Sequence, residues 1–269
     1  MTNSQDHFSN LDLPDRDNSI SAMMSRRVAK WVVNKPLVLK NEQPIVTISF
    51  DDIPATAATN GAKILQAYGA RGTFFVAGGL CGTDDRRNLW RHAGQDAIVE
   101  LAREGHEIGC HTYSHHNVQS LDSSTLVAEL DTNKAFLEGL DCSIQIENFA
   151  FPYGSCGFRQ KRVLEERFKA CRGSRPGIQF RRVDLGMVSS VELYDIDIDA
   201  NTVRKLIDET VRHCGWLVFH THDVKYAPTK FGCSPSLLEA TLKSAELMGA
   251  TVLSMRDALK AISRDPPLL

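Results

Sequence analysis

Two histidines four residues apart, His111 and His115, are the residues of this chain best suited to binding a metal ion. They follow residues 106–110, a run that is typical of a strand. If the backbone turns helically after this strand, both imidazoles lie on one face and can bind the same cation. A catalytic zinc ion usually takes three protein ligands and leaves one position for water, so we expect a third ligand, commonly a carboxylate, from another segment.

Acidic or histidine side chains also follow most of the other runs that are predicted to be strands. Asp51 and Asp52 end the β-rich run 44–50, and His220 and His222 lie at the end of the run 216–220. In a barrel of parallel strands, functional side chains gather at the carboxyl ends of the strands. We therefore expect one shared site. Further candidates at such ends are Tyr153, Asp195, Asp197, Asp199 and Asp223.

Predicted strands and helices alternate along most of the chain, which indicates parallel pairing with crossover helices. The pattern favours an α/β fold, a distorted (β/α) barrel of seven or eight units. The predicted strands are 44–50, 72–77, 106–110, 148–151, 170–172, 187–193, 216–220 and 251–253, and the predicted helices are 60–68, 95–103, one that begins at Asp122 or Ser123, 159–169, 201–213 and 234–248.

The chain divides into an amino-terminal arm or covering helix, residues 1–42, and a catalytic barrel, residues 43–269. The first twenty residues lack the basic start and apolar core of a signal peptide. Basic residues interrupt the more apolar stretch 21–37, and no uncharged run approaches the ~20 residues of a membrane span. An interfacial membrane helix stays open as an alternative, because the stretch combines basic residues with Trp31.

Composition narrows the classes of partner and compartment. With 24% charged residues and a net charge of −2, the chain lacks the basic excess that nucleic-acid binding requires. Its seven cysteines are odd in number and scattered without a Cys-x-x-Cys pair, which argues against a disulfide framework. We expect reduced thiols and a cytoplasmic location. The sequence leaves the oligomeric state open.

Two motifs resemble those of the polysaccharide deacetylases with a NodB-homology domain, carbohydrate esterase family 4. Residues 49–53, Ser-Phe-Asp-Asp-Ile, are similar to the family's Thr-Phe-Asp-Asp-Gly, and residues 111–115 match its His-Ser/Thr-x-x-His. The resemblance covers about residue 45 to the carboxyl terminus. It implies a NodB-like barrel and a divalent metal, most commonly Zn²⁺, with Asp52, His111 and His115 as ligands.

The resemblance also implies catalytic roles. Asp51 would be the general base that takes a proton from the attacking water, and a backbone N–H beside Tyr153 would help to stabilise the oxyanion. A histidine of the last motif would protonate the leaving nitrogen. We favour His222, because the family ends this strand in His-Asp. His220 is the alternative candidate.

The chain departs from the family at three positions. The third motif, Arg-x-Pro-Tyr, has Ala150 where the arginine that orients the base would stand, and Arg172 or Arg175 is a candidate replacement. The fourth motif, Asp-Trp, is reduced to Asp199 followed by alanine. Either Asp199 or Asp197 would hydrogen-bond the acid histidine, or they cap the helix that follows. Ile53 replaces the motif glycine.

The resemblance implies a metal-dependent hydrolase that removes N-acetyl groups from an amino sugar. Without a signal peptide, we expect a nucleotide-linked or lipid-linked intermediate of surface polysaccharide assembly as the carbohydrate substrate. Two alternatives stay open: hydrolysis of another amide or imide C–N bond, and a non-catalytic descendant that binds sugar or a protein partner. An amidohydrolase with His220 and His222 as ligands is disfavoured, because that family's His-x-His pair follows the first strand.

Overall fold

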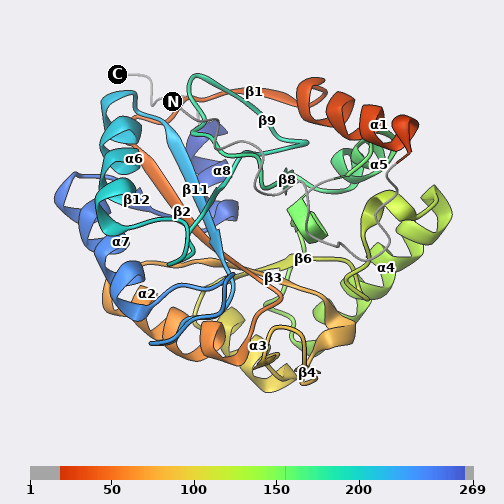
Figure 1. Cartoon of the computed structure of the whole chain (residues 1–269), viewed down its shortest axis with the longest axis horizontal. Helices are drawn as coiled ribbons and strands as arrows, with labels where there is room; N and C mark the ends of the chain where they lie inside the picture. Colours follow the sequence, from red (N-terminus) through yellow and green to blue (C-terminus); the bar gives the residue numbers. More distant parts are fainter. Residues whose placement is uncertain (1–18, 155, 264–269) are drawn as a thin grey trace.

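The computed structural model describes residues 19–154 and 156–263. Residues 1–18 of the predicted amino-terminal arm lie outside this description. A curled sheet of parallel strands forms the centre, with helices around its outside (Figure 1), which confirms the expected distorted (β/α) barrel. The strand order is β10-β11-β2-β3-β6-β7-β8, and β12 pairs with β2. These strands are β2 (Ile45–Asp51), β3 (Thr73–Val76), β6 (Glu107–Cys110), β7 (Asn148–Ala150), β8 (Ala170–Arg172), β10 (Val191–Glu192), β11 (Trp216–Thr221) and β12 (Thr251–Val252).

One irregular segment, residues 185–192, bridges the two edges of this sheet. Its first part lies beside β8, where Val188 N donates to Cys171 O at 2.8 Å and Gly173 N donates to Val188 O at 2.9 Å. Its last two residues form β10, which pairs with β11. The predicted strand 187–193 is therefore regular only at its end, because the segment has to change partner along its length.

The helices lie close to their predicted positions, and side chains cap several of them. Asp122 accepts a hydrogen bond from Thr125 N, and Ser234 accepts one from Leu237 N, as N-cap residues do. A short helix, η1 (Ala57–Gly61), leads into α2. The α-helices are α1 (Ile20–Trp31), α2 (Ala62–Ala67), α3 (Gln95–Arg103), α4 (Ser123–Leu140), α5 (Phe158–Arg167), α6 (Ala200–Arg212), α7 (Pro235–Leu247) and α8 (Met255–Ser263).

Several elements of the described residues were not predicted. Helix α8 follows the strand that was expected to close the series. Two short antiparallel pairs lie outside the main sheet. They are β1 (Pro36–Val38) with β9 (Arg182–Asp184), and β4 (Asp84–Asp85) with β5 (Trp90–Arg91).

Strand β2 is the buried centre of the barrel. All seven of its residues are buried, as expected for a parallel strand covered on both faces. It pairs with β11 on one side and with β3 on the other, and Phe50 stacks on Phe74 of β3 with ring centroids 4.7 Å apart. Packing on all sides therefore fixes the strand that ends in Asp51.

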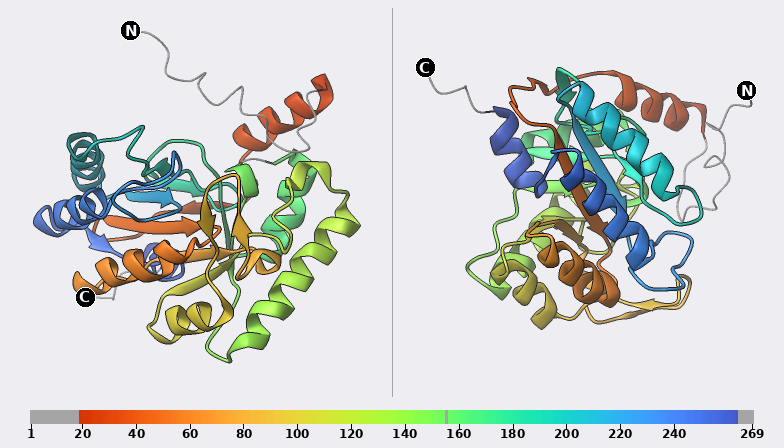
Figure 2. Two further views of the ribbon diagram at one scale, coloured as in Figure 1. Left: turned by 60° about the horizontal axis from the view of Figure 1, so that its bottom comes forward. Right: turned by 90° about the vertical axis from the view of Figure 1, so that its left-hand side faces the viewer.

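Helix α1 packs against α5 (Figure 2). The buried Lys161 of α5 donates to Ala29 O at 3.1 Å and to Val32 O at 2.6 Å, and it pairs with Asp184 at 2.5 Å. This ammonium group thus satisfies carbonyls at the carboxyl end of α1, where a positive charge is favourable. Among the described residues, no helix is long and apolar enough to cross a membrane.

His106 couples stability to pH. Its Nδ1 accepts a hydrogen bond from Gly72 N at 3.1 Å, and burial, together with Arg71, lowers its pKa to about 4. The unfolded chain has a histidine pKa near 6.5, so between pH 6.5 and 4 it binds more protons than the folded chain. Stability therefore increases with pH across this window and is lost as the pH falls through it.

We expect His106→Asn to reduce this loss, because asparagine keeps an acceptor for Gly72 N and does not titrate. In urea unfolding of metal-free protein, the unfolding free energy of the wild type should fall by about 2 kcal/mol more than that of the variant between pH 7 and pH 5. The quantity compared is the change in unfolding free energy between the two pH values, since the smaller side chain also alters packing. An equal change in both proteins would contradict this account.

Candidate active site

Strand geometry brings most of the predicted site residues to one end of the barrel. Because the main strands are parallel, their carboxyl ends meet there. Asp51 is the last residue of β2 and Arg172 is the last of β8. The others follow their strands directly or within a few residues: Asp52 after β2, His111 and His115 after β6, Tyr153 after β7, and His222 after β11.

The turn that carries the two histidines is not helical, so the condition under which the sequence places both imidazoles on one face is not met. Residues 111–117 form no helix, and Thr112 and His115 have φ values of 58° and 54°. These two left-handed residues reverse the chain and bring the imidazole rings of His111 and His115 to 4.9 Å between centroids. Glu129 of α4 holds the turn by accepting from Tyr113 N at 3.1 Å and from Ser114 N at 2.8 Å.

Asp52, His111 and His115 direct their side chains to one point. Asp52 Oδ1 lies 3.6 Å from His111 Nε2 and 3.1 Å from His115 Nε2. Among the described residues they form the one group of three whose potential ligand atoms all lie within 4.8 Å of one another. This is the predicted ligand set.

The protonation of these groups fits a cation. His111 Nδ1 lies 2.8 Å from Ala150 O and donates to it, so Nε2 of the neutral ring presents a lone pair. Burial lowers the pKa of His111 to about 3 and that of His115 to about 4, which keeps both rings neutral. Burial raises the pKa of Asp52 to about 6, and its Oδ1 is buried without a hydrogen-bond partner among the described residues. Lone pairs that face one another in this way are stabilised by a divalent ion, and the donor set suits zinc.

Arg172 takes the place of the missing motif arginine. Its Nη2 donates to both carboxylate oxygens of Asp51, and both side chains are buried. Arg172 is the register partner of Ala150, so the guanidinium comes from the neighbouring strand at the level where the family's arginine would stand. Arg175, the other candidate, is exposed and stacks on Trp31 at 4.4 Å.

This ion pair determines the charge of Asp51. Burial by itself would raise the pKa of the carboxyl group, but the Arg172 guanidinium, together with His111, His222 and His220, outweighs it and holds the pKa of Asp51 well below its usual range. Asp51 is therefore ionised in a buried position, as a general base requires.

His222, and not His220, lies beside the proposed metal ligands. Its Nε2 is 4.0 Å from Asp52 Oδ2, and its Nδ1 donates to Phe231 O at 3.1 Å. His220 lies deeper, with Nδ1 2.9 Å from Ser190 Oγ, and burial lowers its pKa well below the ordinary value. The geometry thus favours His222 over His220, and its role as the acid stays a prediction.

The prediction that Asp199 hydrogen-bonds the acid histidine is wrong. Asp199 is exposed and is the N-cap of α6, where it accepts from Thr202 N at 2.8 Å. The backbone carbonyl of Phe231 is the partner of His222 instead. Asp197 is exposed as well. The second possibility drawn from the sequence, a helix cap, is the correct one for Asp199.

Tyr153 and Trp90 are two of the aromatic residues that surround the site; Tyr194 and Phe231 also pack against His222. Tyr153 has a φ of 58°, and its ring centroid lies 4.8 Å from that of His115. Trp90, from β5, stacks on His222 with centroids 5.6 Å apart and an interplanar angle of 20°. Sequence reasoning missed Trp90, and the only signal for it was a tryptophan inside a loop rich in glycine and charge.

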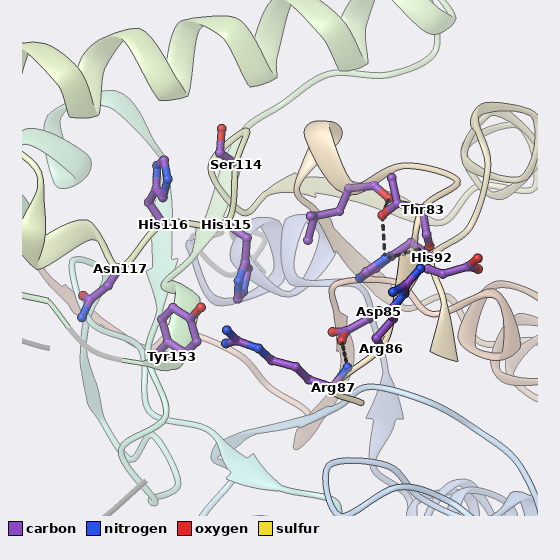
Figure 3. Close-up of a pocket in the computed structure, with 12 residues that line it drawn as sticks. Thr83, Asp85, Arg86, Arg87, His92, Ser114, His115, His116, Asn117 and Tyr153 are labelled. Carbon is purple, nitrogen blue, oxygen red and sulfur yellow. Dashed lines mark hydrogen bonds between the residues drawn. The ribbon is translucent and has the colours of Figure 1, made fainter. Parts of the chain in front are cut away.

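A pocket of about 480 Å³ opens beside the histidines (Figure 3). The segment that carries β4 and β5 forms one wall, and the turn after β6 together with Tyr153 forms another. A substrate group that enters this pocket comes next to His115. The lining residues are Leu80, Thr83, Asp84, Asp85, Arg86, Arg87, His92, Ser114, His115, His116, Asn117 and Tyr153.

Known proteins share both sequence and fold with this chain. Residues 39–167 match the family described as Polysaccharide deacetylase. A curated relative, the chitin deacetylase of Colletotrichum lindemuthianum, is 24% identical over 160 residues, which cover 58% of this chain and 56% of the relative. The match thus spans little more than half the length of that relative.

Solved structures support the fold. The chitin deacetylase structure from Colletotrichum lindemuthianum has a TM-score of 0.60 and 17% identity, and the alignment covers 88% of this chain and 94% of that one. A family 4 acetyl xylan esterase from Clostridium thermocellum has a TM-score of 0.57 and 16% identity, with coverage of 80% and 90%. These findings confirm the resemblance drawn from the sequence: residues 39–167 match the polysaccharide deacetylase family model, and the solved deacetylase and esterase structures share the fold.

Proposed function

We propose that this protein is a metal-dependent hydrolase that removes N-acetyl groups from an amino sugar. One observation carries the proposal: the ionised, buried Asp51 lies next to three side chains arranged for a cation. A general base beside a Lewis-acid site is the arrangement that amide hydrolysis needs. The family match supports a carbohydrate amide as the substrate.

The chain's own residues have distinct roles in this proposal. Asp52, His111 and His115 would hold the cation, which when bound polarises the acetyl carbonyl and favours ionisation of water. Asp51 takes the proton of the attacking water, while Arg172 keeps the carboxylate ionised and fixed in orientation. His222 donates a proton to the leaving nitrogen. The backbone N–H next to the Tyr153 ring is the proposed further donor to the oxyanion.

Zinc is the metal we propose. Two neutral imidazoles and one carboxylate are a common zinc set in hydrolases and leave a coordination position open. The similar acetyl xylan esterase structure is described as a complex with a cobalt ion, which supports a divalent transition metal.

For the substrate, we propose a sugar intermediate of surface polysaccharide synthesis, linked to a nucleotide or a lipid, and a cytoplasmic location. All seven cysteines are free thiols, and four of them are buried, which fits a reducing compartment. The similarity to chitin deacetylase supports an N-acetylated amino sugar.

The alternatives differ in what they require of the site. A non-catalytic binding protein has no need of an ionised base paired with a buried arginine, since such a pair is costly to bury. An amidohydrolase with His220 as a ligand is disfavoured, because His220 is engaged with Ser190 below the site. Hydrolysis of another amide or imide bond uses the same groups, so the assay below includes such substrates.

The metal site is tested by zinc content. We expect about one zinc ion per chain after loading and desalting, and we expect His111→Ala to lose most of it, because two ligands rarely retain the ion. The matched control is His116→Ala, whose half-exposed ring lies 3.9 Å from Glu129 and outside the group of three. Elemental analysis measures the ratio. Equal zinc in His111→Ala and the wild type would disprove the assigned site.

The activity is tested by acetate release from N-acetylated sugars and sugar nucleotides, and by product analysis of C–N cleavage in simple amides and imides. We expect Asp51→Asn to lower kcat by about 10²- to 10⁴-fold with its zinc retained, because the amide cannot accept the proton. Zinc-loaded wild type that releases acetate from none of the sugars, or an Asp51→Asn variant as active as wild type, would refute the proposal. If the protein cleaves only another amide or imide, its substrate class is that amide or imide and not an acetylated sugar.

Two arginine variants serve as a matched pair in the same assay. Arg172→Ala leaves the Asp51 carboxylate without its counter-charge, so kcat should fall at least about 10-fold with less change in KM. Arg175→Ala removes an exposed arginine that stacks on Trp31 and should behave as the wild type. Equal kcat values in both variants would remove Arg172 from the mechanism.

A further inference from the structure

Two arginines line the pocket without an acidic partner. Arg86 and Arg87 are exposed residues of the segment between β4 and β5. In the part of the chain that the structure describes, neither guanidinium takes part in an ion pair. Figure 3 shows the Arg87 side chain extended from this segment toward Tyr153 and His115. The pocket therefore presents two guanidinium groups without ion-pair partners beside the proposed metal ligands.

The acidic residues of the same wall are engaged elsewhere. Asp85 Oδ1 accepts from the backbone N–H groups of Arg87 at 2.8 Å and Asn88 at 3.0 Å, and Oδ2 accepts from Asn88 Nδ2 at 2.9 Å. Asp84 pairs with Arg91 at 3.4 Å. These carboxylates stabilise the β4–β5 turn, and they form no ion pair with either of the two guanidinium groups.

A guanidinium group is suited to an oxyanion. It presents paired donors whose spacing matches a carboxylate or a phosphate. Positive side chains next to a cation repel it, and an anionic ligand between them is attracted by both. Ser114 and Asn117, which line the same pocket, add uncharged hydrogen-bonding groups.

We propose that this pocket is an anion subsite, in which Arg87, assisted by Arg86, binds a carboxylate or phosphate of the substrate. Because the same pocket reaches His115, the acidic group belongs to the acetylated sugar itself or to its immediate neighbour. The inference rests on the proposed function, since it names the class of sugar: an acidic one rather than a neutral one.

Binding tests the subsite without turnover. The zinc-loaded Asp51→Asn protein, in which turnover should be slow, is titrated with N-acetylglucosamine, N-acetylglucosamine 1-phosphate and N-acetylmuramic acid, and ligand-observed NMR gives each Kd. The arginine variants are compared in the same background. We expect at least one acidic sugar to bind about 10-fold more tightly than the neutral one. Arg87→Ala, and more completely Arg86→Ala combined with Arg87→Ala, should abolish this preference. The acid that is preferred identifies the source of the anion, phosphate or carboxylate.

The matched control is Arg212→Ala, which removes the same charge from an exposed i,i+4 pair with Asp208 on α6. It should retain the preference. The subsite is refuted if acidic and neutral sugars bind equally, if the Arg87→Ala preference equals that of the wild type, or if Arg212→Ala loses as much.

Acetate release from the same three sugars separates the two proposals. A preference that depends on Arg87, without acetate release from any sugar, would establish the subsite and refute the deacetylase. Acetate release at equal kcat/KM from acidic and neutral sugars, together with equal binding, would establish the deacetylase and refute the subsite.

Discussion

The buried ion pair between Arg172 and Asp51 is the interaction on which the site depends. A carboxyl group this deep in the barrel would otherwise become protonated, because burial disfavours its charge. Arg172 is itself almost fully buried, and its guanidinium lies 5.5 Å from the ring centroid of Phe75. Buried ion pairs seldom add net stability, since desolvation of both charges offsets their attraction. We therefore interpret this pair as the device that keeps a base ionised at the end of β2.

The barrel makes this arrangement possible, and the strain is concentrated where the chemistry lies. Parallel strands place their ends together, but the side chains converge only because several residues adopt left-handed backbone conformations: Asp52, Thr112, His115 and Tyr153. Among the described residues, Asp52 Oδ1 is buried without a hydrogen-bond partner, which adds to the free-energy cost of this arrangement. Unfavourable backbone conformations and an unsatisfied polar atom thus occur at this end of the barrel, whereas the core around β2 is regular. This is expected for a functional site on a stable scaffold.

Sequence patterns predicted the regular elements, and the family resemblance named the three side chains that the structure brings together, Asp52, His111 and His115. Both failed where tertiary packing decides. Helix 95–103 was predicted to the residue, because its periodicity and the following glycine are local signals. The turn after His111 was not, since a left-handed residue such as Thr112 has no local signature. Arg172 could be chosen over Arg175 only once the register placed it beside Ala150. Helix α8 has an apolar stripe that could have been found, whereas the contact of Trp90 with His222 joins segments more than a hundred residues apart.

The central claim is that one metal ion binds between Asp52, His111 and His115, next to Asp51. Anomalous diffraction from crystals of the protein grown with zinc, recorded above the zinc absorption edge, tests it most directly. The account predicts one strong peak about 2.0–2.2 Å from the Nε2 atoms of both histidines and from a carboxylate oxygen of Asp52. A peak at His220 and His222 instead, or no peak at the three ligands, would contradict it.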